Sequence, residues 1–415
     1  MTSLLRWAKA TFRRVPSLPL CFPTSGFETV SGSELDEERF EEFKKGQYYP
    51  INIGDVLSSR YEIIGKLGFG VTSTVWLARD LDSLYAVKVY TRDKANQEEF
   101  QIYKYLNQGN PSHPGYAHVR KALDVFTIPR PGGGHHEPMW ESFKDLLYRN
   151  PNHRFTEDLL RVGLIQVLLA LDYLHTECKL VHTDIKGDNI LQETEDRAIL
   201  ESFTKAEMEN PSPRKFINGI PVYASQWFEL PKTFGQVVLS DFGSAVRGDE
   251  RRNHDAQPNV YRSPEVMLKA ECWRHGIFLL YILPLHHAPL RLLMSGENQV
   301  WDLFEGKHMF HGNDPDGKGY STRAHLAEVI GILGPPPLDM LKRGKRSLEF
   351  FTEDGRWKPD IEIPQASLEA SEEFLRGRNK EIFLVFMRGM LQWRPEDRKT
   401  AKELLEDPWL NDQID

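Results

Sequence analysis

The chain has 415 residues, of which 40% are hydrophobic and 27% charged, and its formal net charge is −8. These values are typical of a globular protein that is large enough for two lobes with cores of their own. The acidic excess most often serves solubility alone, but it would also suit a basic substrate. Three widely spaced cysteines, Cys21, Cys178 and Cys272, argue against a disulfide framework or a zinc site. Because no apolar run reaches roughly 18 residues, no membrane span is predicted.

The first 48 residues (1–48) are predicted to be a basic and polar N-terminal extension that is mostly disordered, with a short helix associated with its acidic part from Glu34 to Glu42. The stretch 1–27 has no acidic residue, and its prolines at 16, 19 and 23 would end any helix early. Arg-rich segments without acidic residues also serve as mitochondrial targeting sequences, so that role for 1–27 is a minor alternative. The basic side chains of the stretch are Arg6, Lys9, Arg13 and Arg14.

Residues 49–136 are predicted to form a small lobe built on an antiparallel sheet. Three stretches rich in β-branched and aromatic residues are separated by glycines and an Asp-Leu-Asp turn, as in a β-meander. These stretches are 61–64, 74–78 and 84–89. A helix is predicted over 95–107 because apolar residues recur there at helical spacing. They are Phe100, Tyr103 and Leu106.

Residues 137–415 are predicted to form a larger, mainly helical lobe. Apolar residues repeat at steps of three and four between Leu160 and Leu174, which indicates a buried helix. The polar, proline-containing stretch 192–236 is predicted to be an insertion, and another helix is expected over 322–334. Strands first and helices afterwards predict an α+β fold of two lobes with a cleft between them.

A glycine-rich stretch in the small lobe is predicted to fold as a hairpin over nucleotide phosphates. Glycines let backbone N–H groups approach phosphate oxygens without a Cβ in the way. Its residues are Leu67, Gly68, Phe69, Gly70, Val71, Thr72, Ser73, Thr74 and Val75. Ser73 replaces a third glycine, so an ordinary β-turn is the alternative. Lys88 on the next predicted strand strengthens the nucleotide interpretation, because a lysine there would hold the α- and β-phosphates.

The run His182-Thr183-Asp184-Ile185-Lys186-Gly187-Asp188-Asn189, followed by Asp241-Phe242-Gly243, is the most informative feature. Phosphoryl transfer from ATP needs a carboxylate to take the hydroxyl proton and oxygen ligands to hold Mg²⁺. Asp184 is predicted to be the general base, and Lys186 to offset charge on the transferred group. Asn189 and Asp241 are predicted to bind Mg²⁺. Asp188 is interpreted as a structural carboxylate of the loop.

Two ion pairs are also expected. Glu99, at the start of the apolar face of helix 95–107, would orient Lys88; Glu98 is the second choice, and a solvated helix charge is the alternative for either. Later in the chain, the Ser-Pro-Glu sequence that ends at Glu265 resembles the Ala-Pro-Glu sequence of protein kinases, and this resemblance implies a pair of Glu265 with Arg398, which stands where kinases keep an arginine. A bidentate pair of this kind would be structural and partly buried.

From about Ser59 to Leu410 the chain resembles a eukaryotic protein kinase, and within these it is similar to the SR-protein kinases of the CMGC group. The similarity includes the Gly-rich loop continuing as Ser-Thr-Val-Trp-Leu-Ala, Thr183 in place of the arginine of His-Arg-Asp, and the insertion before Asp241. It also includes the Trp-Asp-Leu-Phe-Glu-Gly sequence at 301–306 and the stretch 344–351.

This resemblance implies a bilobal kinase fold and an ATP- and Mg²⁺-dependent serine/threonine kinase. It implies transfer to serine in Arg/Ser-rich segments of splicing factors, and hence a role in the regulation of mRNA splicing. A monomer that acts on proteins, with no direct nucleic-acid binding, is expected. The expected location is the cytoplasm and nucleus.

Two stretches depart from the kinase pattern and leave an alternative open. Gly132 to His136 is poor strand material just before the hinge sequence Glu-Pro-Met-Trp, so a central strand is expected to be cut short. The atypical segment 272–299 stands where kinases have a central helix. The alternative function is therefore a catalytically impaired, kinase-like binding module, either a pseudokinase or a mis-spliced product. A small-molecule kinase is a third possibility.

Overall fold

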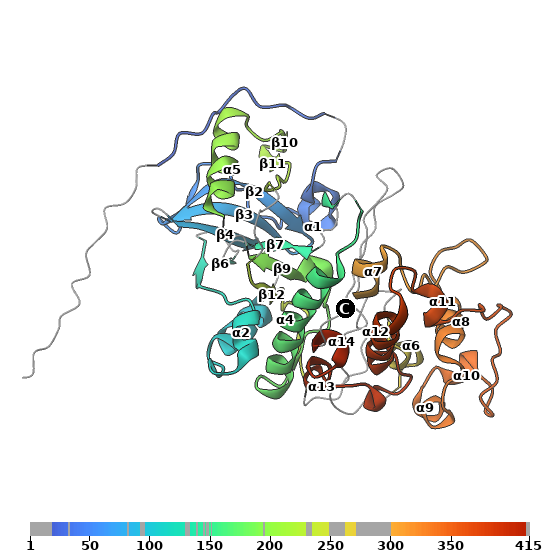
Figure 1. Ribbon diagram of the computed structural model, residues 1–415. Helices are drawn as coiled ribbons and strands as arrows, with labels where there is room; N and C mark the ends of the chain where they lie inside the picture. Colours follow the sequence, from blue (N-terminus) through green and yellow to red (C-terminus); the bar gives the residue numbers. More distant parts are fainter. Residues whose placement is uncertain are drawn as a thin grey trace, which may run out of the picture. The chain divides into compact units, whose positions relative to one another are not determined.

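The computed structural model describes residues 19–31, 34–80, 83–91, 96–128, 133–137, 140–143, 146, 149–150, 152–193, 196–229, 235–248, 262–270 and 300–411. Their Cα positions divide into two compact units (Figure 1). Unit 1 takes residues 1–93, 123–138 and 198–228, and unit 2 takes 94–122, 139–197 and 229–415. Strands dominate the first and helices the second, which confirms the predicted α+β class. The atypical segment 272–299 lies outside the described residues.

Unit 1 is built on a six-stranded antiparallel sheet in the order β1-β2-β3-β4-β6-β5. The strands are β1 (Val56–Leu57), β2 (Tyr61–Gly70), β3 (Ser73–Asp80), β4 (Ser83–Tyr90), β5 (Asp124–Thr127) and β6 (Gly133–Glu137). Alternate residues of β2, β3 and β4 point into a core that contains Ile63, Trp76 and Val87. The meander predicted over 61–89 is present.

The strand that was expected to be cut short is present as β6. It pairs with β4 from Ala86↔Glu137 to Val89↔Gly134 and with β5 on its other side. The prediction was wrong because strand propensity mainly measures how side chains fit a sheet surface, and it yields to context. Here two flanking strands provide hydrogen-bonding partners for both edges of a glycine- and histidine-containing segment.

The expected disorder of residues 1–48 is wrong for residues 34–48, although the short helix expected in the extension is present. This segment contains the 3₁₀ helix η1 (Glu37–Arg39) and the short helix α1 (Glu41–Lys44). It buries five side chains, Asp36, Glu37, Glu38, Phe43 and Tyr48. An acidic run is typical of a solvated tail. Here, however, its carboxylates form ion pairs with Lys66 of the sheet and Lys215 of the insertion. Residues 1–18 lie outside the described part.

The predicted insertion folds into unit 1. It contains α5 (Arg197–Glu209) and a hairpin of β10 (Arg214–Ile217) and β11 (Ile220–Tyr223), which Figure 1 shows beside β2 and β3. Asn218 and Gly219, both with positive φ, form the two-residue turn that this hairpin type favours. Gly65 of β2 is required for the contact with α5, because a Cβ there would lie 2.7 Å from the ring of Phe203.

Unit 2 combines two small sheets with many helices. One sheet has the order β12-β9-β7 and the other pairs β13 with β8. These strands are β7 (Trp140–Ser142), β8 (Leu180–Val181), β9 (Ile190–Glu193), β12 (Val237–Leu239) and β13 (Val246–Arg247). The helices are α2 (Asn96–Asn107), η2 (Pro114–His118), α4 (Glu157–Thr176), η3 (Gly187–Asn189), α6 (Pro264–Leu268), α7 (Val300–Glu305), α8 (Thr322–Leu333), α9 (Leu338–Arg343), α10 (Ser347–Phe350), α11 (Leu368–Ser371), α12 (Gly377–Met390), η5 (Pro395–Asp397), α13 (Ala401–Leu405) and α14 (Pro408–Asn411).

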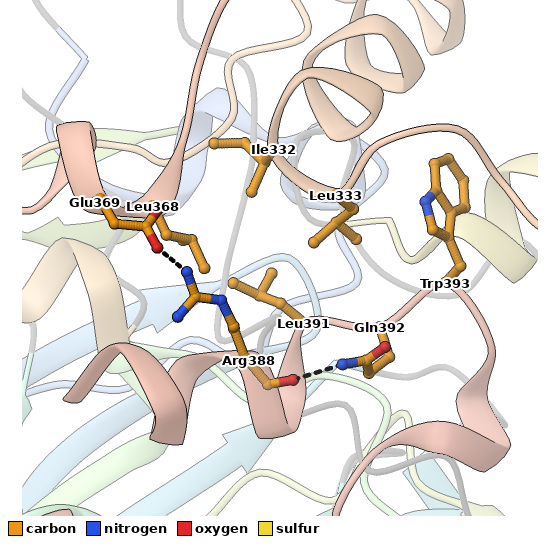
Figure 2. A pocket seen from close by; sticks show the side chains of 8 residues that line it. All are labelled: Ile332, Leu333, Leu368, Glu369, Arg388, Leu391, Gln392 and Trp393. Carbon is orange, nitrogen blue, oxygen red and sulfur yellow. Dashed lines mark hydrogen bonds and ion pairs between the residues drawn. The ribbon is translucent and has the colours of Figure 1, made fainter. Parts of the chain in front are cut away.

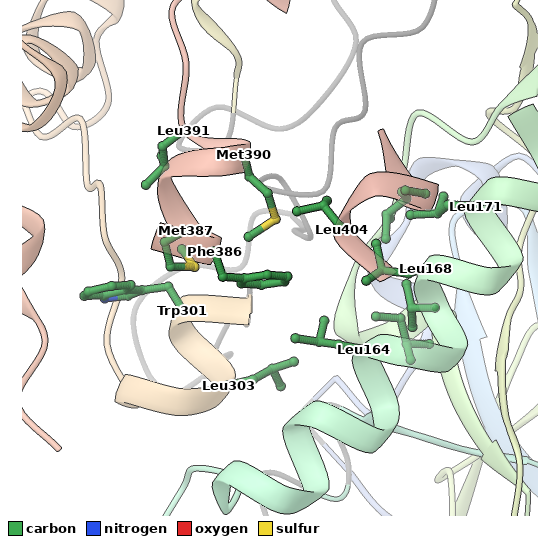
Figure 3. Packing of buried hydrophobic residues seen from close by; sticks show 14 of the residues in the cluster. Leu164, Leu168, Leu171, Trp301, Leu303, Phe386, Met387, Met390, Leu391 and Leu404 are labelled. Carbon is green, nitrogen blue, oxygen red and sulfur yellow. The ribbon is translucent and has the colours of Figure 1, made fainter. Parts of the chain in front are cut away.

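The central helix of unit 2 is α4, as the leucine periodicity predicts. Thr156 caps its first turn by accepting the N–H of Leu159. Its leucines pack against residues of α7, α12 and α13 (Figure 3). Among the described residues, α4 alone is long and apolar enough to cross a membrane, and half of its apolar window is buried inside the protein. Its place in this core accounts for its apolar composition.

We predict that unit 2 loses stability as the pH rises because of Glu305 at the end of α7. Burial, and next the charge of the buried Glu372, raise the pKa of Glu305 from 4.5 to about 7. A carboxyl group with a raised pKa binds its proton more tightly in the folded chain. The stabilisation that this carboxyl group gives to the folded chain is therefore complete below pH 4.5 and is lost as the pH rises through 7. Up to about 3 kcal/mol of unfolding free energy is involved, measurable by urea unfolding at several pH values.

Glu305→Gln removes this titration, so the stability difference between the variant and the wild type should change by about 3 kcal/mol across that range. Glu373→Gln is the matched control, since Glu373 lies next to Glu372 and pairs with Lys307 near the surface. It should change the pH profile far less, because the charge of Glu373 is the last and smallest of the causes that shift the pKa of Glu305. Parallel profiles for Glu305→Gln and the wild type would contradict the assignment.

Candidate active site

The predicted catalytic run lies in unit 2, in the loop and 3₁₀ turn between β8 and β9. His182 anchors it: Nε2 donates to the carbonyl of Ser240 (2.8 Å) and Nδ1 accepts the N–H of Asp184 (3.3 Å). The imidazole is 1% exposed, and burial lowers the pKa of His182, so the ring stays neutral and keeps both bonds. The loop is thereby fixed to the strand that leads into Asp241.

Asp184 and Lys186 form an ion pair in this loop, with Nζ 2.9 Å from Oδ2. Burial raises the pKa of Asp184, although the charge of Lys186 acts in the opposite direction. Burial alone would lower the pKa of Lys186, but the charge and hydrogen bond of Asp184 outweigh it and raise that pKa. The arrangement places a carboxylate with increased basicity beside a cation, as expected for a proton acceptor next to a transferred anionic group.

Asn189 connects the base to the metal-binding candidates. Its side-chain NH₂ donates to the backbone carbonyl (2.8 Å) and to Oδ2 (3.2 Å) of Asp184. The amide nitrogen of Asn189 is thus used as a donor to Asp184, and the amide oxygen is the atom of this side chain that can accept a hydrogen bond or bind a cation. The Asn189 carbonyl accepts the N–H (2.8 Å) and the hydroxyl (3.1 Å) of Ser240, the residue before Asp241. Asn189 and Asp241 are therefore held on adjoining backbone segments.

Asp241 has the unusual φ of +61°. Non-glycine residues adopt this left-handed conformation uncommonly, and aspartate is among those that adopt it most readily. A Cβ built on Gly243 would lie 3.4 Å from Oδ1 of Asp241 and 3.3 Å from Oε2 of Glu99, so both carboxylates approach this glycine. A carboxylate and an amide oxygen are hard donors that suit Mg²⁺, which completes its coordination with water and phosphate oxygens. The residues present fit that ion.

Glu99 is buried on α2 in unit 2. One turn further along α2, the ring of Tyr103 meets the fully buried ring of Phe242 edge-on, at 5.6 Å. Helix α2 therefore packs directly on the Asp-Phe-Gly sequence. Lys88 belongs to unit 1, so its predicted ion pair with Glu99 stays a prediction. The side chain of Glu98 is outside the described set.

The predicted phosphate-binding hairpin is formed by β2 and β3 in unit 1. Gly70 pairs with Ser73, and Val71 and Thr72 make the turn. A Cβ on Gly68 or Gly70 would meet no atom of the described residues within 4 Å, so packing does not demand glycine at either position. A phosphate group that came close to this backbone would favour glycine at both positions, because glycine has no Cβ in the way. Phe69, Leu67 and Thr74 complete the two strands of this hairpin.

Lys88 and Val75 are direct cross-strand partners on β4 and β3. Their side chains therefore leave the same face of the sheet. The Lys88 ammonium lies 4.9 Å from the ring centre of Tyr90, two residues along the same strand. Unit 1 thus presents Val75 of the predicted hairpin and the lysine predicted to hold phosphates side by side.

The structure contains the predicted pair of Glu265 and Arg398. Nη1 and Nη2 of the guanidinium donate to Oε1 and Oε2 of the carboxylate, both at 2.7 Å. Each side chain is 2% exposed. The arginine also donates to the carbonyl of Gln392, so η5 and α6 are joined at this point.

Three residues contribute to the loop through hydrogen bonds that the sequence did not predict. His182 and Ser240 fix the loop, and the Thr183 hydroxyl donates to the carbonyl of Ser244 (2.6 Å) just after Asp-Phe-Gly. Thr183 also has a φ of +64°. A histidine and a serine that bond to backbone atoms across 58 and 51 residues leave no local pattern. The signal that the sequence did offer was the histidine itself, which stands where the His-Arg-Asp sequence of protein kinases begins.

A shallow pocket also lies in unit 2 at the ends of α8 and α12 (Figure 2). Arg388 crosses it to reach Glu369, and the indole of Trp393 closes one side. It contains none of the residues predicted to act on ATP or on a substrate hydroxyl. We assign it no part in the transfer reaction.

Comparison with known proteins agrees with this geometry. Residues 61–410 match the protein kinase domain family. A serine/threonine protein kinase of Aspergillus fumigatus is 40% identical over 417 residues, which cover 96% of this chain and 97% of that protein. The serine/threonine-protein kinase SRPK of Physarum polycephalum is 29% identical over 411 residues, with 91% and 92% covered.

A crystal structure of a kinase domain has the same fold, with a TM-score of 0.63 at 19% identity, and the match covers 88% of this chain and all of that one. Together with the catalytic loop and the Asp-Phe-Gly sequence, these likenesses decide the family. The chain belongs to the eukaryotic protein kinases, as a serine/threonine kinase of the SR-protein kinase type in the CMGC group.

Proposed function

We propose that this kinase transfers the γ-phosphoryl group of ATP to serine in Arg/Ser-rich protein segments, with Mg²⁺ as cofactor. The observation that carries the proposal is the loop geometry of unit 2, where Asp184 contacts Lys186 at 2.9 Å and Asn189 at 3.2 Å. These are the base, cation and metal ligand that phosphoryl transfer uses.

Each residue has a distinct role in the proposed reaction. Asp184 accepts the proton of the substrate hydroxyl, and its raised pKa favours that acceptance. Lys186 lies beside the base and offsets negative charge on the transferred group. Asn189 and Asp241 hold Mg²⁺, which neutralises phosphate charge when bound. On unit 1, the hairpin N–H groups and Lys88 hold the phosphates, while Val75 contacts adenine.

The proposed substrate class rests on similarity and on charge. The Physarum relative is named SRPK, and the net charge of −8 favours encounters with arginine-rich segments. Splicing factors in the cytoplasm and nucleus are the proposed partners, and the proposed state is a monomer. The presence of β6 removes one reason for a catalytically impaired module. Neither the described residues nor the comparisons favour that alternative.

Transfer of labelled phosphate from Mg²⁺–ATP to an Arg-Ser repeat peptide tests the function, and Lys88→Met tests the nucleotide site. We expect the variant to lower kcat/KM by about 10²-fold, because a preorganised phosphate contact is removed. Lys104→Met, an exposed lysine on α2, is the matched control and should leave the rate unchanged.

Three results would count against these assignments. Wild-type transfer no higher than that of Asp184→Asn would refute the kinase activity. Equal rates for Lys88→Met and the wild type would refute the role of Lys88 alone. Equal transfer to a serine peptide in which every arginine is replaced by glutamine would refute the Arg/Ser substrate class and leave the kinase assignment intact.

A further inference from the structure

The N-terminal segment 34–48 contacts the Gly-rich hairpin at three places in unit 1. The first is an ion pair network around Lys66, the β2 residue just before the hairpin sequence. Its side chain is completely buried, with Nζ 2.9 Å from Oδ2 of Asp36, in contact with Glu37, and 2.9 Å from the carbonyl of Tyr223. A buried ammonium needs such partners, so the segment is part of the sheet's stable structure.

The second contact is aromatic. Phe69 of the hairpin lies 6.0 Å from the ring of Phe40 and 5.1 Å from the guanidinium carbon of Arg39. Such contacts each contribute modestly, and here both act on one hairpin residue. They hold the segment beside β2, close to the hairpin end (Figure 1).

The third contact is at the turn itself. The hydroxyl of Tyr48 donates to the carbonyls of Gly70 (2.6 Å) and Val71 (2.7 Å). Tyr48 is 5% exposed and packs against Phe43 with ring centres 5.8 Å apart. Burial, and then the charges of Glu37 and Glu42, raise the pKa of Tyr48, so the phenol keeps the proton that it shares between the two carbonyls.

These two bonds fix the direction of the neighbouring N–H groups. In a planar trans peptide unit, the C=O and the N–H point in opposite directions. The units that carry the Gly70 and Val71 carbonyls carry the N–H groups of Val71 and Thr72. Because both carbonyls are turned toward Tyr48, both N–H groups are turned away from it.

We propose that Tyr48 is a positioning residue for ATP, whose hydroxyl aims the Val71 and Thr72 N–H groups at the nucleotide phosphates. The inference rests on the proposed function of the hairpin as a phosphate-binding element. It assigns to a residue outside the kinase-like part of the chain, which begins near Ser59, a direct influence on nucleotide affinity. Without the hydroxyl, the turn peptides are free to rotate and must be ordered again when ATP binds.

The test is Tyr48→Phe, which keeps the ring and its packing and removes only the hydroxyl. We expect KM for ATP and Kd for Mg²⁺–ADP, measured by calorimetry, to rise roughly 3- to 10-fold, the effect of one hydrogen bond. The kcat at saturating ATP and KM for the peptide should stay within about 2-fold. In the absence of nucleotide, amides 68–75 should exchange hydrogen faster than in the wild type.

Tyr61→Phe is the matched control. Tyr61 is another fully buried tyrosine of unit 1, and its hydroxyl donates to Asp124 Oδ2 (3.0 Å) at the opposite end of β2. It should lower Tm to a similar extent without changing the affinity for either nucleotide.

Unchanged nucleotide affinity and unchanged exchange in Tyr48→Phe would overturn the proposal, as would equal losses in both variants. If Tyr48→Phe were too unstable for kinetics, hydrogen exchange at reduced temperature would still decide, since loss of protection confined to 68–75 supports the proposal and uniform loss overturns it. Absence of ADP binding and phosphate transfer in the wild type would instead refute the kinase function.

Discussion

Asp184→Asn should lower kcat for phosphoryl transfer by roughly 10²- to 10⁴-fold, the range that a positioned general base contributes. The amide cannot take the hydroxyl proton, and it also loses its charge interaction with Lys186. KM for ATP should change little, because the carboxylate accepts a proton and is not a proposed phosphate ligand. Steady-state kinetics with an Arg-Ser peptide measures both constants.

Asp172→Asn is the matched control, with the same carboxylate-to-amide change in α4 of unit 2. Asp172 lies on α4, outside the catalytic loop, and its carboxylate is 3.4 Å from His113. Its kcat should equal that of the wild type. A kcat for Asp184→Asn within a few-fold of the wild type, in a protein with unchanged Tm, would exclude Asp184 as the base.

The pH dependence of the wild type provides a second check on Asp184. Burial raises the pKa of Asp184, and a base acts only when it is deprotonated. The acid side of the profile of kcat/KM for ATP, which reports the groups of the free enzyme, should therefore lie at higher pH than an ordinary aspartate would give. A profile that stays flat down to the ordinary range of aspartate would show that another group takes the proton.

The catalytic loop could be predicted from sequence because its chemistry is local. Asp184, Lys186 and Asn189 lie within six consecutive positions, and a single turn of backbone brings their polar groups together. The pair of Glu265 and Arg398 is separated by 133 residues. It was predicted only because the chain resembles a family that keeps a carboxylate and an arginine at these places.

The surroundings of the hairpin could not be predicted, and the reason is physical. Asp36 and Glu37 are acidic residues in a polar stretch, and the sequence does not show that Lys66, buried in β2, neutralises them. The insertion posed the same difficulty. Its polar composition suggests solvent exposure, yet Phe203 packs on Gly65 and Tyr223 meets Trp76 edge-on at 5.7 Å. Burial by distant partners leaves no periodic signal in a short segment.

Arg398→Met should destabilise unit 2 by about 3–5 kcal/mol, because it leaves the Glu265 carboxylate buried without its partner. The carboxylate loses two hydrogen bonds of 2.7 Å, and its side chain is 2% exposed, so water cannot replace them. The Gln392 carbonyl loses its donors as well. Urea unfolding followed by tryptophan fluorescence measures the change, and the midpoint should fall with the slope unchanged.

Glu265→Leu combined with Arg398→Met separates the charge from the packing. A buried ion pair replaced by apolar side chains of similar size is often close to neutral, so the double variant should recover most of the stability that Arg398→Met loses. Arg394→Met, four residues away, breaks a surface contact with Asp339 and should leave the midpoint nearly unchanged. If the double variant were no more stable than Arg398→Met, an uncompensated charge could not explain the loss. The guanidinium would then act through its packing between η5 and α6.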